Sequence, residues 1–186
     1  MRLESKRLIL RNFTSIDVDD FYEYMSLEST AKYEDFEPLT YSQCVTSVER
    51  RSKLDNVFAV ILKETGKMIG DVNFSEGDYE GTYEIGYDFN VKFWNKGYAT
   101  EACISMINYI FDEIGARRIY ALCNDDNFSS IKLLERIGMR REGHFIEDVS
   151  FKRDFKGDLI YINSYLYALL KKNGIIDNMN WSMGYK

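Results

Sequence analysis

The order of apolar patterns along the 186 residues predicts an α/β fold of the α+β type, with a mixed, mostly antiparallel sheet flanked by helices. Two observations carry this prediction. Strand-like apolar runs stand near both ends of the chain, where neighbouring runs are joined without a long helix, as in antiparallel pairs. Near the middle, a long amphipathic stripe separates two strand-like segments, and a helix that crosses between strands leaves them parallel.

The first elements expected from the N-terminus are one strand and two helices. The strand covers residues 8–13, and the first helix runs from about residue 16 to residue 27 behind two hydroxyl side chains that offer caps. After a loop that contains the single proline, the second helix passes through residues 45–48, and either Thr40 or Ser42 can cap it.

Three strands are expected next. Residues 57–62 are apolar throughout, the turn residues 64–67 follow, and residues 68–74 return as a hairpin partner. The segment of residues 83–91 alternates with period two, so it has a polar face and an apolar face. The apolar positions are Tyr83, Ile85, Tyr87, Phe89 and Val91.

A long helix is expected from Ala99, because apolar residues recur at i, i+3, i+4 and i+7 as far as Ile114, and Gly115 is placed to end it. The remaining elements are a strand, a short helix and a final strand pair, over residues 117–123, 129–137, 140–149 and 158–169. No linker or repeat is visible, so we expect one domain over residues 1–172 and a C-terminal tail over residues 173–186.

Charge and composition exclude several classes of protein. Lys and Arg total 24 against 30 Asp and Glu, and the net charge of -6 and pI near 5.0 have the wrong sign for a nucleic-acid binder. No segment is apolar enough to span a membrane, and the first residues lack the apolar core of a signal peptide. Three scattered cysteines and one histidine suggest neither a disulfide framework nor a metal site. We therefore expect a cytoplasmic monomer or homodimer.

The junction between the polar-faced strand and the long helix is a candidate anion site. Backbone N–H groups and the positive end of the helix dipole converge there, which suits a phosphate or pyrophosphate. Gly97 permits close approach of the backbone, Ala99 keeps the helix start uncrowded, and Thr100 adds a hydroxyl. A plain strand-to-helix turn with a glycine is the alternative. No phosphate loop with nucleoside-triphosphatase spacing is present.

Residues 94–102, Trp-Asn-Lys-Gly-Tyr-Ala-Thr-Glu-Ala, resemble the acetyl-CoA pyrophosphate loop of the GNAT N-acetyltransferases, specifically of their RimJ/RimL-like branch. Residues 7–11, 84–87 and 127–143 agree with that family in order and spacing. The resemblance covers roughly residues 7–169. It implies the GNAT acyl-CoA N-acyltransferase fold, with a splayed parallel strand pair at the cofactor site. It also implies direct transfer from acetyl-CoA to an amine, without a metal, redox cofactor or covalent enzyme intermediate.

The same resemblance implies which residues bind acetyl-CoA. The loop and the helix start would hold the pyrophosphate, and the end of the preceding strand would offer backbone groups to the pantetheine amides. Asn127 would hydrogen-bond the pantetheine arm, and it can also be the N-cap of its own helix. Asn95 replaces a glycine of the branch, and asparagine tolerates left-handed backbone angles. The expected residues are Phe89, Asn90, Val91, Asn95, Lys96, Gly97, Tyr98, Ala99, Thr100 and Asn127.

Two residues are candidates for proton transfer, since the amine must lose a proton and the departing thiolate must be stabilised. Glu84 is the first candidate for the base, directly or through water, with pairing to an arginine as its structural alternative, and Glu147 is a weaker second base. By the same resemblance, Ser130, in the Asn-x-x-Ser pattern of residues 127–130, is the candidate acid; Leu134 stands where many GNAT enzymes carry a tyrosine in that role. The alternative for Ser130 is a structural role in the first helical turn.

The acceptor amine is left open. The branch suggests the α-amine of a protein N-terminus, but it also contains members that act on polyamines, amino sugars or drugs. The acidic residues of segments 34–37 and 78–80 would favour a cationic amine if they rim the site, although solvated surface acids are the alternative. A second hypothesis is a non-catalytic acyl-CoA-binding regulatory module.

Overall fold

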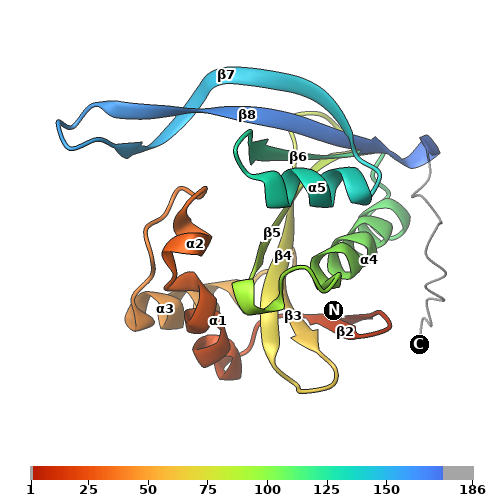
Figure 1. Cartoon of the computed structure of the whole chain (residues 1–186). Coiled ribbons are helices and arrows are strands. Elements are labelled where there is room, and N and C mark those ends of the chain that lie inside the picture. Colours follow the sequence, from red (N-terminus) through yellow and green to blue (C-terminus); the bar gives the residue numbers. More distant parts are fainter. Residues whose placement is uncertain (1, 174–186) are drawn as a thin grey trace.

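The structure is a computed structural model that describes residues 2–173 (Figure 1); the expected tail, apart from its first residue, lies outside these described residues. Eight strands form a sheet in the order β1-β2-β3-β4-β5-β6-β8-β7. Every neighbouring pair is antiparallel except β5 and β6. The strands are β1 (Arg2–Glu4), β2 (Leu8–Arg11), β3 (Val57–Leu62), β4 (Met68–Glu76), β5 (Thr82–Phe89), β6 (Arg118–Asn124), β7 (Arg140–Arg153) and β8 (Leu159–Leu170). The predicted mixed sheet is confirmed.

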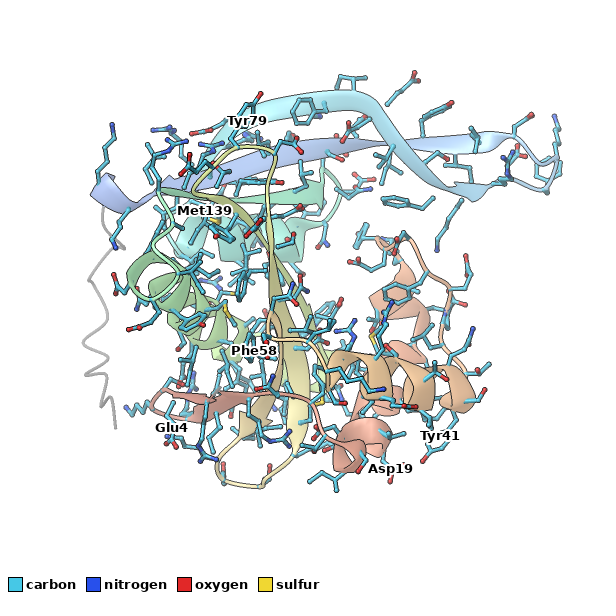
Figure 2. All side chains as sticks on the ribbon, turned by 180° about the vertical axis from the view of Figure 1, so that it is seen from behind. Glu4, Asp19, Tyr41, Phe58, Tyr79 and Met139 are labelled. Atoms are coloured by element: carbon cyan, nitrogen blue, oxygen red, sulfur yellow. The ribbon has the colours of Figure 1, made fainter. Side chains whose placement is uncertain are left out.

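Helices cover both faces of this sheet (Figure 1). They are α1 (Val18–Met25), α2 (Glu28–Ala31), α3 (Tyr41–Arg51), α4 (Tyr98–Asp112) and α5 (Phe128–Arg136), with 3-10 turns at Ser15–Asp17, Val91–Phe93 and Lys171–Asn173. The first core cluster joins α4 and α5 to one face, and the second joins α1 and α3 to the other. Phe58, which is fully buried, lies near the middle of the sheet (Figure 2).

Alternate residues of a strand face these two cores, as the period of two requires. In β3, Phe58 and Val60 belong to the core under α4, whereas Ala59 and Ile61 belong to the core under α1 and α3. This strand is therefore covered on both faces, which explains why its sequence is apolar throughout.

The pairing of β5 with β6 is short. Thr82–Glu84 pair with Arg118–Tyr120, and no further residues of the two strands pair. Downstream, β5 keeps its antiparallel partner β4 as far as Phe89, and β6 keeps β8 as far as Asn124. The two strands therefore separate within the sheet, and α4 and α5 begin next to the opening.

Side-chain caps explain where two of the five helices begin. Thr40, rather than Ser42, caps α3, and its side chain and that of Gln43 form a reciprocal capping box. Asn127 caps α5 by accepting from the N–H of Ser130 at 3.1 Å.

Three predicted elements need correction. The helix expected over residues 16–27 is interrupted: α1 ends at Met25, and extended backbone at Leu27 separates it from α2. The first strand ends at Arg11, whose side chain turns to pair with Asp17. The last strand pair is longer than expected, because register shifts in β7 break the alternation without ending the strand. In addition, β1 was not predicted.

Candidate active site

A cavity of about 520 Å³ lies beside the opening between β5 and β6. Its walls come from the end of β5, the loop into α4, the first turn of α4, α5 and the segment around α2. Tyr87 and Asp88 are consecutive on β5, so their side chains leave opposite faces of the sheet, yet both line the cavity. The cavity therefore passes through the sheet from one face to the other.

One wall of the cavity is a cradle of backbone N–H groups. In the described part of the chain, the N–H groups of residues 95–100 donate to no protein acceptor, and the first helical bond of α4 is donated by Glu101 to the Gly97 carbonyl at 3.1 Å. Asn95 and Gly97 both have positive φ, 58° and 79°. The expectation that asparagine accepts the left-handed conformation is confirmed. Free N–H groups at the start of a 15-residue helix form an anion site.

A buried ion pair anchors this cradle to the N-terminal strands. Glu101 is 3% exposed, and its carboxylate accepts from the Arg7 Nε at 2.7 Å, the Arg7 backbone N–H at 2.7 Å and the Ser5 hydroxyl at 2.7 Å. The Arg7 guanidinium also donates to the Lys96 carbonyl at 3.0 Å and lies over the Tyr98 ring. Because Arg7 neutralises Glu101, the acid does not repel an anion in the cradle.

Further positive charge lies across the cavity on α5. Lys132 and Arg136 both line it, and the Arg136 guanidinium donates to the Thr100 hydroxyl at 3.3 Å. This end of the cavity thus combines free N–H groups with two cationic side chains, which suits a pyrophosphate or phosphate group.

Two hydroxyls meet where the cavity passes β5. The Tyr87 and Ser130 hydroxyl oxygens are 2.6 Å apart. Burial raises the pKa of Tyr87 well above its usual value, so the phenol stays protonated at neutral pH. Ser130 belongs to the first turn of α5, next to its cap. The pair offers a hydroxyl that can donate a proton into the cavity.

The cavity also has an acidic wall on the face of the sheet that carries α1 and α3. Asp88 and Glu34 both line it. Burial, followed by the charges of Asp71 and Glu34, raises the pKa of Asp88 well above its usual value. Burial, followed by the charges of Asp35 and Asp71, raises the pKa of Glu34. One cavity therefore has a cationic wall and an acidic wall.

The structure brings most of the predicted site residues to this cavity. Eight line it: Phe89, Asn95, Gly97, Tyr98, Ala99, Thr100, Asn127 and Ser130. Glu84, Asn90, Val91 and Lys96 are not among its lining residues.

Glu84 lies where β5 is still paired with β6. It accepts a hydrogen bond from the Tyr120 hydroxyl at 3.3 Å, so its observed partner is a phenol rather than the arginine considered as its alternative. Burial raises the pKa of Glu84, and the bond from Tyr120 partly opposes that rise. Glu84 shares its face of β5 with Asp88, the face of the acidic wall.

The backbone groups expected to meet pantetheine are partly used within the protein. The Phe89 carbonyl accepts from the Trp94 indole N–H at 2.7 Å, and the Asn90 N–H donates to the Ile69 carbonyl at 3.0 Å. Trp94 therefore fixes the loop against the end of β5. Asn127 acts as the N-cap and lines the cavity, so both of its expected roles are compatible with its position.

Sequence reasoning gave no site role to Arg7, Tyr87, Asp88 or Glu101. Arg7, Tyr87 and Glu101 stand within the segments that resemble the GNAT family, and Asp88 stands on the polar face of its predicted strand. Glu34 belongs to an acidic segment that was considered only as a possible rim. Glu147, the second candidate base, is exposed on β7 and is not a lining residue.

Residues 2–173 contain no group of three or more His, Cys, Asp or Glu side chains placed to hold a metal ion. None of the helices among them is both long and apolar enough to cross a membrane.

Comparison with known proteins gives consistent matches. A family model described as "Acetyltransferase (GNAT) domain" matches residues 7–140. The chain is 36% identical over 174 residues to the uncharacterized N-acetyltransferase YnaD of Bacillus subtilis strain 168, with 92% of this chain and 98% of that protein covered. It is 35% identical over 180 residues to the uncharacterized N-acetyltransferase p20 of Bacillus licheniformis, with 91% and 96% covered.

A solved structure agrees as closely. The GNAT-family acetyltransferase from Bacillus anthracis superposes with a TM-score of 0.85 at 33% identity, over 92% of this chain and 99% of that chain.

Proposed function

The chain belongs to the GNAT family of N-acetyltransferases, and on that premise we propose that it transfers the acetyl group of acetyl-CoA directly to a primary amine. Membership is shown by the family model and the relatives, which also confirm the expected fold. The observation that carries the proposal is the run of backbone N–H groups of residues 95–100, which donate to no acceptor within residues 2–173; five of these six residues line the cavity.

The residues present fit acetyl-CoA. The N–H cradle, Lys132 and Arg136 supply the donors and the charge that a pyrophosphate needs. A pantetheine arm that leaves the cradle along the open edge of β5 passes Phe89 and Asn127 and reaches the two hydroxyls of Tyr87 and Ser130. A cavity of about 520 Å³ is within the usual range for a ligand site.

When bound, acetyl-CoA supplies a thioester carbonyl for the amine to attack and a thiolate to leave. Ser130 donates a proton to the leaving sulfur, and Tyr87, hydrogen-bonded to it, fixes the orientation of its hydroxyl. Glu84 accepts the proton of the amine through water, and its raised pKa makes it a stronger base than an exposed carboxylate. The role of Ser130 replaces that of the tyrosine whose place is taken by the buried Leu134.

The branch and the compartment are parts of the same proposal. The four segments that resemble the RimJ/RimL-like branch support a protein N-terminal amine or a small-molecule amine as acceptor. We place the enzyme in the cytoplasm, because its three cysteines are buried and unpaired, as is typical of a reducing compartment.

The test is a thiol-release assay with acetyl-CoA and a panel of amines, peptides and polyamines. Because burial raises the pKa of the Cys123 thiol to about 11, the native protein adds little background to a thiol reagent. Ser130→Ala and Glu84→Gln should each lower kcat about 100-fold, in the range for a lost acid or base. The matched controls are Ser75→Ala and Glu76→Gln, at exposed positions on β4.

Three outcomes decide between the hypotheses. Full turnover in both site variants would make the catalytic assignment wrong. Binding of acetyl-CoA without turnover on any amine of the panel would favour the non-catalytic regulatory module. Loss of kcat in both site variants, with both controls at wild-type rates, is the result that we expect.

A further inference from the structure

The acidic wall of the cavity is not explained by the binding of acetyl-CoA. A negatively charged cofactor gains nothing from carboxylates, and the N–H cradle and the α5 cations lie on other walls. Asp88 comes from β5, and Glu34 comes from the segment that follows α2. The two acids thus reach the cavity from two different elements, on the same face of the sheet.

Arg51, the cation that faces Asp88, is already paired with another acid. Arg51 of α3 pairs with Asp71 at 2.5 Å, and the Tyr24 hydroxyl of α1 donates to the same carboxylate at 2.6 Å. Asp71 is fully buried and sits opposite Asp88 in the β4–β5 ladder. Its charge is therefore satisfied within the protein.

Asp88 and Glu34 have no such partners. Within residues 2–173, no hydrogen bond or ion pair reaches either carboxylate. The groups that face Asp88 are Asp71, Glu34 and Asp35, which repel its charge, and Arg51, which attracts it. Both carboxylates are partly buried in the cavity wall, and a partly buried carboxylate with more acids than bases around it is costly to ionise unless a cation joins it.

We propose that Asp88 and Glu34 bind the positively charged end of the acceptor, so that the substrate is a cationic amine with no carboxylate beside its ammonium group. The proposal rests on the proposed function and names its substrate class. An ammonium group between the two acids would donate charge-assisted hydrogen bonds to both carboxylates, which accept none from residues 2–173. A carboxylate on the carbon next to the amine would enter the same acidic wall and be repelled.

The position of the wall agrees with this assignment. Asp88 follows Tyr87 on β5, and Tyr87 meets Ser130 on the other face of the sheet. An amine held by Asp88 therefore lies across the opening from the hydroxyl that serves the leaving thiolate. Donor and acceptor reach the reacting carbon from the two faces of the sheet, and neither has to displace the other.

The experiment measures amine binding to the protein saturated with CoA, by calorimetry, with two pairs of probes. Cadaverine and lysine differ by one carboxylate, and so do tyramine and tyrosine. In each pair the amine without the carboxylate should bind at least 10-fold more tightly. Asp88→Asn and Glu34→Gln should each weaken cadaverine binding at least 10-fold and change the Kd for CoA less than twofold.

The control variant is Glu80→Gln, an exposed acid of the other acidic segment, which should bind cadaverine like the wild type. Asp88→Asn should keep or raise the melting temperature, because it removes a repelled charge, so weaker binding in that variant cannot be attributed to unfolding. In addition, cadaverine affinity should increase with pH above the ordinary carboxylate range, since raised pKa values delay ionisation of both acids.

The outcomes separate the two proposals. Equal binding of cadaverine and lysine, wild-type affinity in both site variants, or no cadaverine binding by a protein that binds CoA would overturn the acceptor site and leave the acetyltransferase standing. Failure to bind CoA at all would instead refute the proposed function, and with it the acceptor site.

Discussion

The ion pair between Arg7 and Glu101 offers the sharpest test of how the N–H cradle is held. In Arg7→Ala, the Glu101 side chain, 2% exposed, keeps only the Ser5 hydroxyl and a backbone N–H as donors. Breaking one side of a buried pair costs about 3–5 kcal/mol. Since the Arg7 side chain is 35% exposed and solvent screens part of its charge, we expect a smaller loss than this range, about 2–3 kcal/mol.

Urea denaturation of the wild type, Arg7→Ala, Glu101→Gln and the double variant measures this loss. The double variant should recover at least about 1 kcal/mol relative to the sum of the single variants, because each single variant leaves one unpaired charge and the double variant leaves none. Affinity for CoA should also fall in Arg7→Ala, since the guanidinium no longer holds the Lys96 carbonyl.

The matched control is Arg2→Ala, in a surface pair with Glu4 whose side chains are 58% and 44% exposed. That change should cost less than about 0.5 kcal/mol. A loss below about 1 kcal/mol in Arg7→Ala, or strict additivity in the double variant, would refute the reasoning.

Three further predictions concern two glycines whose backbone positions disfavour a Cβ and one glutamate that stabilises the fold at neutral pH. Gly97→Ala should cost about 1–2 kcal/mol, because φ is 79° there, and it should weaken CoA binding in the same calorimetric titration. Gly70→Ala should cost about 2–3 kcal/mol in urea denaturation, because a Cβ would lie 2.4 Å from the Asp88 carbonyl oxygen and force β4 away from β5. Hydrogen bonds from Lys67 and then Lys92 lower the pKa of Glu23 to about 2, so its contribution to stability is present above pH 4.5 and is lost as the pH falls towards 2. Glu23→Gln should therefore lower stability by about 1 kcal/mol at pH 7, after allowance for solvent screening, and by progressively less as the pH falls to 2 in acid titrations of unfolding.

Local patterns predicted the cradle because its parts are neighbours in the sequence. The alternation in residues 83–91, the glycine at residue 97 and the apolar stripe of the long helix all lie within one continuous segment. The left-handed angle at Asn95 also follows from the residue type and its place in the loop. The separation of β5 from β6 was implied by the family resemblance and not by any local pattern, because it depends on where the pairing of the two strands stops.

The other parts of the site depend on contacts between distant segments. Tyr87 meets Ser130 across 43 positions, and Arg7 meets Glu101 across 94. Residues so far apart in the sequence produce no periodic pattern that would predict their contact. Asp88 was missed for a different reason: a polar strand face is usually solvated, but here Asp71, Arg51 and the segment of Glu34 lie around it.

The end of the first helix is another feature that the local sequence pattern did not predict. Apolar spacing continues through residues 25–27, but the chain leaves the helical conformation at Leu27 and starts again as α2. This break brings Ser29, Thr30 and Glu34 to the cavity wall. Tertiary packing, rather than helix propensity, decides the boundary.

The central claim is that the cavity binds acetyl-CoA through the N–H cradle, and calorimetric titration of the wild-type protein with acetyl-CoA tests it most directly. CoA and 3′-dephospho-CoA serve as comparison ligands, because all three share the pyrophosphate. We predict saturable binding of all three with a stoichiometry of one per chain. A folded protein that binds none of them would contradict both the acetyltransferase and the regulatory acyl-CoA-binding module.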